Sequence, residues 1–397
     1  MAGADVVVVG AGAAGISVAL AAKRFGLGPL VLDQAPTAGA AWRGRYDRLR
    51  LNTSRPFSHL PGRPFPRGTQ LYPTRDQLVA HLDRHAHEDG IRLRLGVRVE
   101  RIDRAEDAWQ LDTSDGEIRA SQVVVASGYE NEPFLPGWAG RERFQGHLVH
   151  SSQYRSAAPF RGLRVLVVGS GSSGMEIAYD LVEGGAARVW LAARTPPNIV
   201  LRTSYGPVPG DVLDGALMRL PVRVADWLSR LAQRSDVGDL AEYGLPFPDE
   251  RIFARIRRTG AAPTIVDREV VEAIRARRFE VVAAVESLEA HDVVLADGRR
   301  LSPDAVVCAT GYRRGLETLV GHLGVLDDHG APRRLGADPA APGLRFVGYV
   351  PRPGALKYIG HEARAVAGAV AREQRKGRAI AVGRAPRRAP SARSRAA

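Results

Sequence analysis

The sequence of 397 residues predicts an α/β protein with two dinucleotide-binding (Rossmann-like) domains, one of them inserted in the other. Two observations lead to this fold class. Two G-x-G-x-x-G turns each lie between an apolar run and a stretch with helical spacing. Strand patterns and a final helical pattern follow the second turn, so the two ends of the chain can complete one domain together.

The first turn, GAGAAG, follows the apolar run VVVV, which suits a strand buried on both faces. Gly10 permits the tight turn, Gly12 lets a pyrophosphate come close, and Gly15 lets helix and strand pack together. Asp33 ends the next apolar run, where a carboxylate can accept hydrogen bonds from a ribose. In this complete β-α-β setting, the turn predicts a bound dinucleotide.

The second turn, GSGSSG, repeats the arrangement after the run VLVV, with Gly169, Gly171 and Gly174 in the equivalent places. Its following apolar run ends near Arg194 instead of an acid. A carboxylate there would repel a 2′-phosphate, whereas a guanidinium binds one through charge-assisted hydrogen bonds. We therefore expect NADPH rather than NADH at the second turn, and a nucleotide with a different role at the first.

Between the turns the sequence alternates like an antiparallel meander and returns to a core strand at Val123–Ala126. A similar strand in DAVVCATGY closes the second nucleotide region, and a final helix is expected at about His361–Arg372. These patterns predict an NADPH domain inserted in a discontinuous FAD domain. The expected boundaries are 1–155 for the first part of the FAD domain, 156–300 for the NADPH domain with a helical insertion near 207–260, 301–374 for the second part of the FAD domain, and 375–397 for a disordered basic tail.

The composition, 45% hydrophobic and 25% charged, is that of a globular protein. No apolar run reaches the ~20 residues of a membrane span, and a first charge at Asp5 does not fit a secretory leader, so we expect a cytoplasmic protein. The net charge of +13 includes eight Lys and Arg, without any acid, in residues 375–397. We interpret that segment as a solvated tail and expect no nucleic-acid partner, with binding to an anionic surface as the alternative.

Cys308 is the only cysteine and lies in the apolar run DAVVCATGY. One thiol cannot form the intrachain redox pair of a disulfide-reducing flavoenzyme. Apolar surroundings raise the pKa of a thiol, so we interpret Cys308 as structural rather than nucleophilic. No metal site is predicted.

Further motifs accompany the two turns: AGAAWR, YDRLRLNTSR, LYPTRDQL, FQGHLVHSSQY and VVCATGYR. FQGHLVHSSQY fits the pattern F-x-G-x-x-x-H-x-x-x-Y at Phe144, Gly146, His150 and Tyr154. Together, these motifs resemble those of the class B flavin-containing monooxygenase family over roughly residues 5–372, nearest to its plant YUCCA-type and small bacterial members.

The resemblance implies an enzyme with FAD at the first turn and NADPH at the second. In the implied reaction NADPH reduces FAD, O2 adds at the flavin C4a carbon, and the hydroperoxide transfers one oxygen atom. The acceptor is a small nitrogen or sulfur nucleophile, or a 2-oxo acid or other carbonyl substrate. An FAD-dependent NADPH oxidase or reductase without oxygen insertion is one alternative, and a redox-sensing nucleotide-binding protein is another. A homodimer is left open.

Asn52, in LNTSR, is the residue that we expect beside the flavin, because its amide both donates and accepts hydrogen bonds. Without the resemblance, LNTSR is typical of an Asx turn. His150 is expected to help set the relative orientation of the two domains, and Arg202 is a second candidate for the NADPH phosphates. The candidate cofactor-binding residues are Gly10, Gly12, Ala13, Ala14, Gly15, Asp33, Gln34, Ala41, Trp42, Asn52, Thr53, Gly169, Gly171, Ser172, Ser173, Gly174, Arg194 and Arg202.

Two parts of the chain depart from the family pattern or are hard to interpret. YUCCA-type proteins usually lack an Asn at the position of Asn52, which weakens a transfer of their substrate, indole-3-pyruvate. Residues 207–260 carry helical patterning with an apolar stripe, which we expect to pack over the active site rather than to bind a membrane. The stripe consists of Leu217, Leu220, Val224, Trp227 and Leu231.

Overall fold

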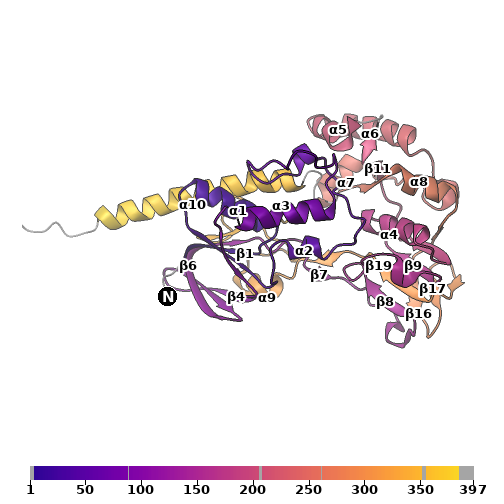
Figure 1. Cartoon of the computed structure of the whole chain (residues 1–397), viewed down its shortest axis with the longest axis horizontal. Coiled ribbons are helices and arrows are strands. Elements are labelled where there is room, and N and C mark those ends of the chain that lie inside the picture. The colour runs from indigo at the N-terminus through magenta and orange to yellow at the C-terminus, as the bar shows by residue number, and fades with distance from the viewer. Residues whose placement is uncertain (1–3, 88, 205–207, 261, 351–354, 384–397) are drawn as a thin grey trace, which may run out of the picture.

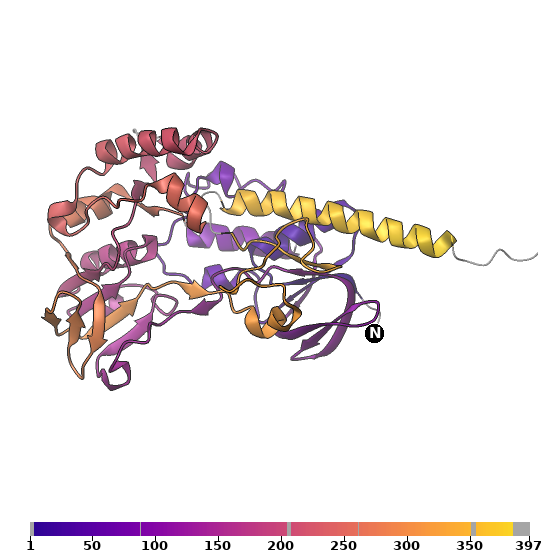
Figure 2. The same cartoon turned by 180° about the vertical axis from the view of Figure 1, so that it is seen from behind.

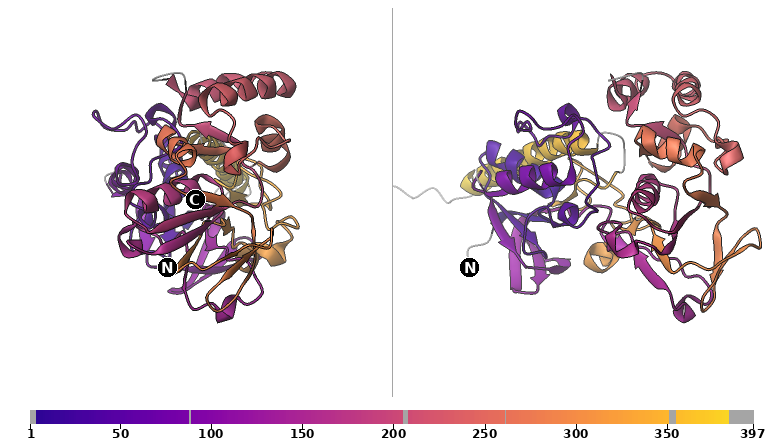
Figure 3. Two further views of the ribbon diagram at one scale, coloured as in Figure 1. Left: turned by 90° about the vertical axis from the view of Figure 1, so that its right-hand side faces the viewer. Right: turned by 45° about the vertical axis from the view of Figure 1, so that its right-hand side comes forward.

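A computed structural model describes residues 4–87, 89–204, 208–260, 262–350 and 355–383. Its elements form two lobes, each built on a sheet (Figure 1). The indigo beginning and yellow end of the chain share the first lobe, and the magenta-to-orange middle forms the second. The right-hand view of Figure 3 separates the two lobes. The predicted α/β class, with one Rossmann-like domain inserted in another, is confirmed.

The sheet of the first lobe has seven strands within the described part of the chain. Their order is β3-β2-β1-β6-β5-β4, and β21 pairs with β6. Strand β21 comes from near the end of the chain and runs parallel to β6. The two separate parts of the first domain are therefore joined within one sheet. The meander is β4-β5-β6, whereas β3 runs parallel to β2. The strands are β1 Ala4–Val9, β2 Pro29–Asp33, β3 Arg92–Leu95, β4 Val99–Arg104, β5 Trp109–Thr113, β6 Gly116–Val125 and β21 Leu344–Phe346.

Two long helices of the first lobe pack side by side. Helix α1 (Ala13–Arg24) and helix α10 (Ala355–Gly383) contribute Ile16, Ala363 and Val370 to one buried cluster. Figure 2 shows α10 running past the lobe. The remaining helices of this lobe are α2 Ala40–Arg43, α3 Arg75–His87 and α9 Glu317–Val320.

Helix α10 corrects the expected end of the fold. It runs to Gly383, so residues 375–383, predicted to lie in a disordered tail, are helical. This stretch is rich in Ala, Arg and Lys, which are strong helix formers and continue the preceding helix. Residues 384–397, the rest of the predicted tail, lie outside the described residues.

The second lobe is built on five parallel strands in the order β15-β10-β9-β19-β8, as far as the described residues show. Strands β8 and β19 belong to this sheet, so it extends beyond the predicted limits of 156–300 at both ends. Every residue of β19 is buried, as a strand between two parallel neighbours requires. The strands are β8 His147–His150, β9 Arg164–Val168, β10 Arg188–Ala192, β15 Glu280–Val282 and β19 Ala305–Cys308.

Smaller elements surround this sheet. The helices are α4 Ser172–Glu183, α5 Gly210–Leu217, α6 Val222–Asp236, α7 Ile252–Thr259 and α8 Arg268–Arg275. The minor strands are β11 Ile199–Leu201, β12 Thr203–Ser204, β13 Val208–Pro209, β14 Thr264–Val266, β16 Val285–Leu288, β17 Val293–Leu295 and β18 Arg300–Leu301. Short 3-10 segments lie at Arg55–Phe57, Arg141–Arg143, Ala158–Phe160, Ala241–Tyr243 and Gly321–Leu323.

The two chain segments that connect the lobes pair with each other. Strand β7 (Glu132–Pro133) precedes the second sheet and β20 (Tyr312–Arg313) follows it, and the two are antiparallel. Arg45 of the first lobe donates from Nη1 to the Tyr312 hydroxyl at 2.6 Å. The two segments that cross between the lobes are therefore paired with each other and tied to the first lobe at the same point.

His150 joins the same two crossings. Its Nδ1 accepts the Ser152 N–H at 3.1 Å, which leaves Nε2 as the donor to the Gly311 carbonyl at 3.0 Å. Burial lowers the pKa of His150, so the ring stays neutral and keeps this tautomer near pH 7. These contacts suit a structural histidine that orients the lobes.

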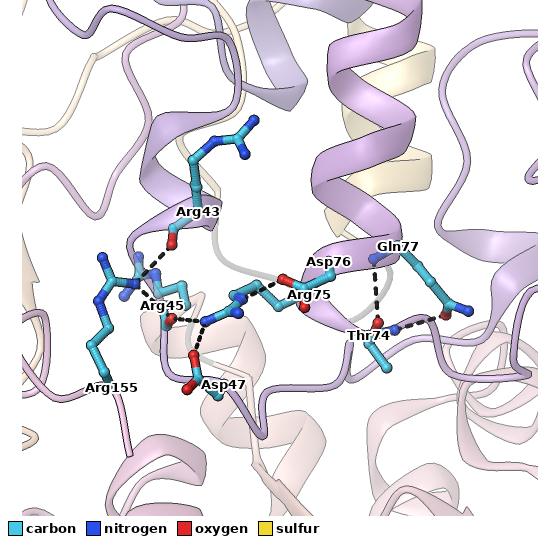
Figure 4. A network of polar contacts seen from close by, with 8 residues as sticks. All are labelled: Arg43, Arg45, Asp47, Thr74, Arg75, Asp76, Gln77 and Arg155. Carbon is cyan, nitrogen blue, oxygen red and sulfur yellow. Dashed lines mark hydrogen bonds and ion pairs between the residues drawn. The ribbon is translucent and has the colours of Figure 1, made fainter.

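A polar network ties Arg155, which follows β8 in the second lobe, to the first lobe (Figure 4). Arg155 donates from Nη1 to the carbonyls of Arg43 and Arg45, at 2.7 and 2.8 Å. Arg75, at the start of α3, donates to the Arg45 carbonyl at 2.7 Å and pairs with Asp47 at 2.5 Å. The loop before Tyr46 is thus held both by α3 of the first lobe and by Arg155 of the second lobe.

Candidate active site

Both glycine turns have a backbone that only glycine accommodates easily. Gly10 and Gly169 have φ angles of 110° and 115°, in the left-handed region. A Cβ on Gly15 would lie 1.7 Å from the Gly10 carbonyl oxygen, and a Cβ on Gly174 would lie 1.7 Å from that of Gly169. Helices α1 and α4 can approach their strands only because these positions lack side chains.

The middle glycine of each turn faces open space. Among the described residues, no atom beyond the chain neighbours lies within 4 Å of a Cβ built on Gly12 or Gly171. Each caps its helix in an extended conformation without a side-chain hydrogen bond, so the first N–H groups are left for a ligand. A pyrophosphate needs this combination of space, N–H donors and a positive helix end. The turns therefore fit two dinucleotides.

Asp33 lies at the end of β2 with its carboxylate turned back to the first glycine turn. Its Oδ2 accepts the Ala11 N–H at 2.6 Å, and its Oδ1 accepts the Ala35 N–H at 2.8 Å. The Gly39 N–H donates to the Ala11 carbonyl at 2.9 Å, which brings the start of α2 to the same turn. Each carboxylate oxygen keeps a second lone pair for a ribose.

The other candidates around the first turn differ in exposure. Ala13 and Ala14 are buried in the first turn of α1. Gln34 and Ala41 are exposed. Trp42 is half-buried and packs against the core of the first lobe.

A pocket of about 180 Å³ lies beside the second glycine turn. Ser170 and Gly171 line it from the turn, Thr195 from the loop after β10, and Arg255 from α7. Arg194 is exposed and directly precedes Thr195. Arg255 was not among the predicted site residues, because nothing in the arginine-rich sequence of α7 distinguishes it from its neighbours. On the turn itself, the Ser172 hydroxyl accepts the Ile265 N–H at 2.9 Å, and Ser173 is half-buried.

A buried ion-pair cluster joins the two lobes. Arg202, directly after β11, is 2% exposed, contacts Glu176 of α4 at 2.5 Å, and forms an ion pair with Asp267. Tyr46 of the first lobe donates to the other Glu176 oxygen at 2.6 Å. Burial raises the pKa of both Tyr46 and Glu176, and for Glu176 the Arg202 charge opposes that effect. Tyr46 therefore stays protonated and remains the donor.

Arg202 also reaches Asn52. Its Nη2 donates to Asn52 Oδ1 at 3.2 Å, so one of the two lone pairs of the amide oxygen is used and the two N–H donors of Nδ2 remain. Asn52 itself is exposed. Two residues on, the N–H and hydroxyl of Ser54 both donate to Asp211 of α5, at 2.7 and 2.8 Å. The insertion thus contacts the loop that carries Asn52.

Two predicted cofactor-binding residues have side chains that are engaged within the protein. The guanidinium of Arg202, predicted as a second contact for the NADPH phosphates, is buried and paired with Glu176 and Asp267, so we do not assign it a phosphate. Thr53 is 9% exposed, and its hydroxyl lies 2.5 Å from that of Ser58. That hydroxyl therefore bonds within its own loop.

The apolar stripe of the insertion also lies differently from the prediction. Leu220 is 38% exposed, Val224 44%, Trp227 56% and Leu231 44%. Only Leu217 packs, half-buried, against a small cluster that includes Ala225 of α6. The expectation that this stripe covers the active site is wrong, because α6 is held to the protein by its polar side.

Cys308 is fully buried in β19, and burial raises the pKa of its thiol to about 12. The thiol is therefore neutral at pH 7 and unsuited to nucleophilic chemistry. Within the described ranges, no group of three or more His, Cys, Asp or Glu could hold a metal ion. No helix in the same ranges has the length and apolar character to cross a bilayer.

Comparisons with known proteins agree with this geometry. Residues 7–204 match the family described as pyridine nucleotide-disulphide oxidoreductase. Indole-3-pyruvate monooxygenase YUCCA1 of Oryza sativa subsp. japonica is 33% identical over 324 residues, which cover 81% of this chain and 79% of that protein.

Two solved structures share the fold. Flavin-containing monooxygenase from Stenotrophomonas maltophilia has a TM-score of 0.72 at 24% identity, over 94% of this chain and 100% of that chain. OTEMO in complex with FAD and NADP has a TM-score of 0.72 at 17% identity, over 94% and 85%.

The two glycine turns, the inserted second sheet and the lone buried cysteine define a flavoprotein of two dinucleotide-binding domains that has no disulfide redox pair. With the curated relatives, they show that the chain belongs to the class B flavin monooxygenase family, whose members are FAD-dependent NADPH monooxygenases.

Two alanine substitutions in the first turn should separate folding from nucleotide binding. Gly12→Ala should fold, because the added Cβ meets open space, but should weaken FAD binding by roughly tenfold or more because the methyl group takes the place of the pyrophosphate. Gly15→Ala should fail to fold, since its Cβ would overlap the Gly10 carbonyl. Circular dichroism and FAD titration measure the two effects. Undiminished FAD affinity in Gly12→Ala would contradict this assignment.

Proposed function

We propose that the enzyme transfers one atom of O2 to a small 2-oxo acid or other carbonyl substrate, with soft nitrogen or sulfur nucleophiles as the second substrate class. The curated relatives named indole-3-pyruvate monooxygenases support a 2-oxo acid. Indole-3-pyruvate itself is not assigned, because Asn52 departs from the YUCCA pattern. The observation that carries the proposal is that Asn52 of the first lobe is held by Arg202 of the second.

We assign FAD to the first glycine turn and NADPH to the second. The N–H groups at the start of α1 would hold the FAD pyrophosphate, and Asp33 would hold its ribose. The start of α4 would hold the second pyrophosphate, and Arg194 and Arg255 would neutralise the 2′-phosphate. When bound, the reduced flavin supplies the electrons that activate O2.

The protein's own contribution centres on the orientation of Asn52. The hydrogen bond from Arg202 to Oδ1 fixes the orientation of the amide and leaves both N–H groups of Asn52 to favour a negatively charged or oxygen-rich ligand. Arg202 is in turn held by Glu176, which lies on α4 within two residues of Gly174. Arg202 is thus a positioning residue that links the second glycine turn to Asn52.

The remaining expectations are kept as part of this proposal. They are a cytoplasmic location and the lack of a nucleic-acid partner, both expected from the sequence, and a homodimer, which is left open. They do not affect the assignment of the two nucleotide sites.

Substrate specificity can be tested with the FAD-loaded enzyme, NADPH and a panel of amines, thioethers, ketones and 2-oxo acids. A 2-oxo acid or ketone should give NADPH consumption matched by oxygenated product. Consumption matched only by hydrogen peroxide, for every compound, would contradict the proposal and favour the oxidase.

Asn52→Ala should leave FAD bound and NADPH oxidation intact, but should divert reducing equivalents to hydrogen peroxide. We expect the ratio of product to peroxide to fall on the order of tenfold or more, because a donor beside the reacting oxygen is lost. Arg202→Lys should shift the ratio in the same direction. Gln110→Ala is the amide control, since Gln110 lies in the β4-β5-β6 meander and its side chain contacts only Asp112 among the hydrogen bonds described. An unchanged ratio in Asn52→Ala would refute the role of Asn52.

Arg194→Ala should raise the KM for NADPH by roughly ten- to a hundredfold, because a charge-assisted hydrogen bond contributes about 1.5–3 kcal/mol. The KM for NADH should change little, since NADH lacks the 2′-phosphate. Arg255→Ala tests the second cation in the same assay, and Arg143→Ala, an exposed arginine outside the second sheet, is the control. Equal effects on both nucleotides would contradict a 2′-phosphate contact.

A further inference from the structure

Helix α6 buries its polar side and exposes its apolar side. Asp226 accepts the N–H groups of Phe253 and Ala254, at 2.7 and 3.3 Å, and so caps the start of α7. Gln233 donates from Nε2 to the Ile199 carbonyl at 2.9 Å. Asp226 and Gln233 are both buried. These contacts fix which side of α6 faces the protein.

The opposite side carries a row of large apolar side chains, here called the α6 face. Val224, Trp227 and Leu231 are spaced by three and four residues, which places them on one side of the helix, and Leu220 lies two residues before the helix begins. Trp227, in the middle, is more than half exposed. Helices of globular proteins normally turn such a stripe to the core, so an outward stripe indicates an interaction surface.

The charges around the α6 face are positive. Arg219, Arg223 and Arg234 are exposed, and Arg230 lies beside them with a hydrogen bond to a backbone carbonyl. The acids between residues 218 and 236 are the buried Asp226 and the terminal Asp236. A partner must therefore offer an apolar layer next to negative charge.

This charge pattern disfavours a second copy of the chain. In a symmetric dimer the same patch meets itself, which would place the arginines of one copy against those of the other. A protein partner would also have to supply a cavity for the protruding Trp227. A fluid bilayer needs no matching cavity.

We propose that the α6 face docks the protein on a bilayer of anionic phospholipids. Guanidinium groups bind phosphate oxygens, tryptophan favours the membrane interface, and an amphipathic helix can lie in the plane of that interface. Helix α6 lies at the outer edge of the second lobe in Figures 1 and 2, whereas the start of α5 contacts the first lobe through Asp211 and Ser54. The outer position of α6 leaves the face accessible to a planar surface. The proposal does not rest on the oxygenase function.

The test is co-sedimentation of the full-length, FAD-loaded protein with lipid vesicles. Vesicles of equal parts phosphatidylcholine and phosphatidylglycerol should bind the protein, and phosphatidylcholine alone should not. Trp227→Ser combined with Leu231→Ser should weaken binding by roughly tenfold or more. Arg223→Glu combined with Arg234→Glu should weaken it by more than about 25-fold, because each basic residue contributes roughly fivefold.

Matched variants control for general changes in polarity and charge. Phe25→Ser removes an aromatic side chain that is 43% exposed at the end of α1. Arg143→Glu combined with Arg333→Glu makes the same charge change at exposed arginines elsewhere. Both controls should bind vesicles within about twofold of the unaltered protein, allowing for weak long-range charge effects. Flavin absorbance and thermal unfolding should be the same for all variants.

Several results would overturn the proposal. One is no preference for anionic vesicles. Another is unchanged binding by the α6 variants together with loss of binding on removal of residues 384–397, which would assign the contact to the chain end. A third has two parts: the unaltered protein does not bind lipid, and light scattering shows that it is a dimer. In that case Trp227→Ser combined with Leu231→Ser would convert the dimer to a monomer.

Discussion

The buried guanidinium of Arg202 is the interaction on which the relation between the two nucleotide turns depends. It lies on the second lobe, is neutralised by Glu176 and Asp267, and holds Asn52 of the first lobe. Dehydration of buried charges offsets much of their attraction, so the cluster adds little net stability. Loss of one partner would still cost about 3–5 kcal/mol, because an uncompensated charge would stay buried. The cluster therefore defines position more than it stabilises the fold.

The backbone around the crossings supports the same relative position. Strands β7 and β20 pair where the chain enters and leaves the second lobe, and His150 bonds to the Gly311 carbonyl beside them. Arg155 of the second lobe donates hydrogen bonds to two backbone carbonyls of the loop before Tyr46. Tyr46 then reaches Glu176, so the crossings and the ion-pair cluster form one connected set of contacts. Two nucleotides bound at the turns would meet across the contact between the lobes, which is held both by the crossing strands and by the ion-pair cluster.

The exposed α6 face takes no part in the contact between the two lobes. The buried Asp226 of α6 caps α7 and the buried Gln233 bonds to β11, and these contacts determine which side of the helix faces the protein. The neighbouring helix α5 does contact the first lobe, through Asp211 and Ser54. The insertion therefore has one helix directed to the active site and one directed outward.

The sequence alone determined the features that depend on local chemistry. Gly10, Gly12 and Gly15 could be assigned because a tight turn, a close approach and a helix contact each require a missing side chain. The same holds for the second turn, for the class of fold, and for Cys308, whose apolar neighbours in the chain are also its neighbours in β19.

Only the tertiary structure decided the features that depend on partners distant in the chain. Arg202 resembles any other arginine until Glu176 and Asp267 are placed beside it, and Arg255 becomes a pocket residue only when α7 lies against the second turn. The periodicity of α6 shows that an apolar stripe exists, but not which way it faces. That direction is set by Asp226 and Gln233, whose backbone partners lie on other elements of the fold. Side-chain burial and pairing are properties of the packed chain, and local spacing does not contain them.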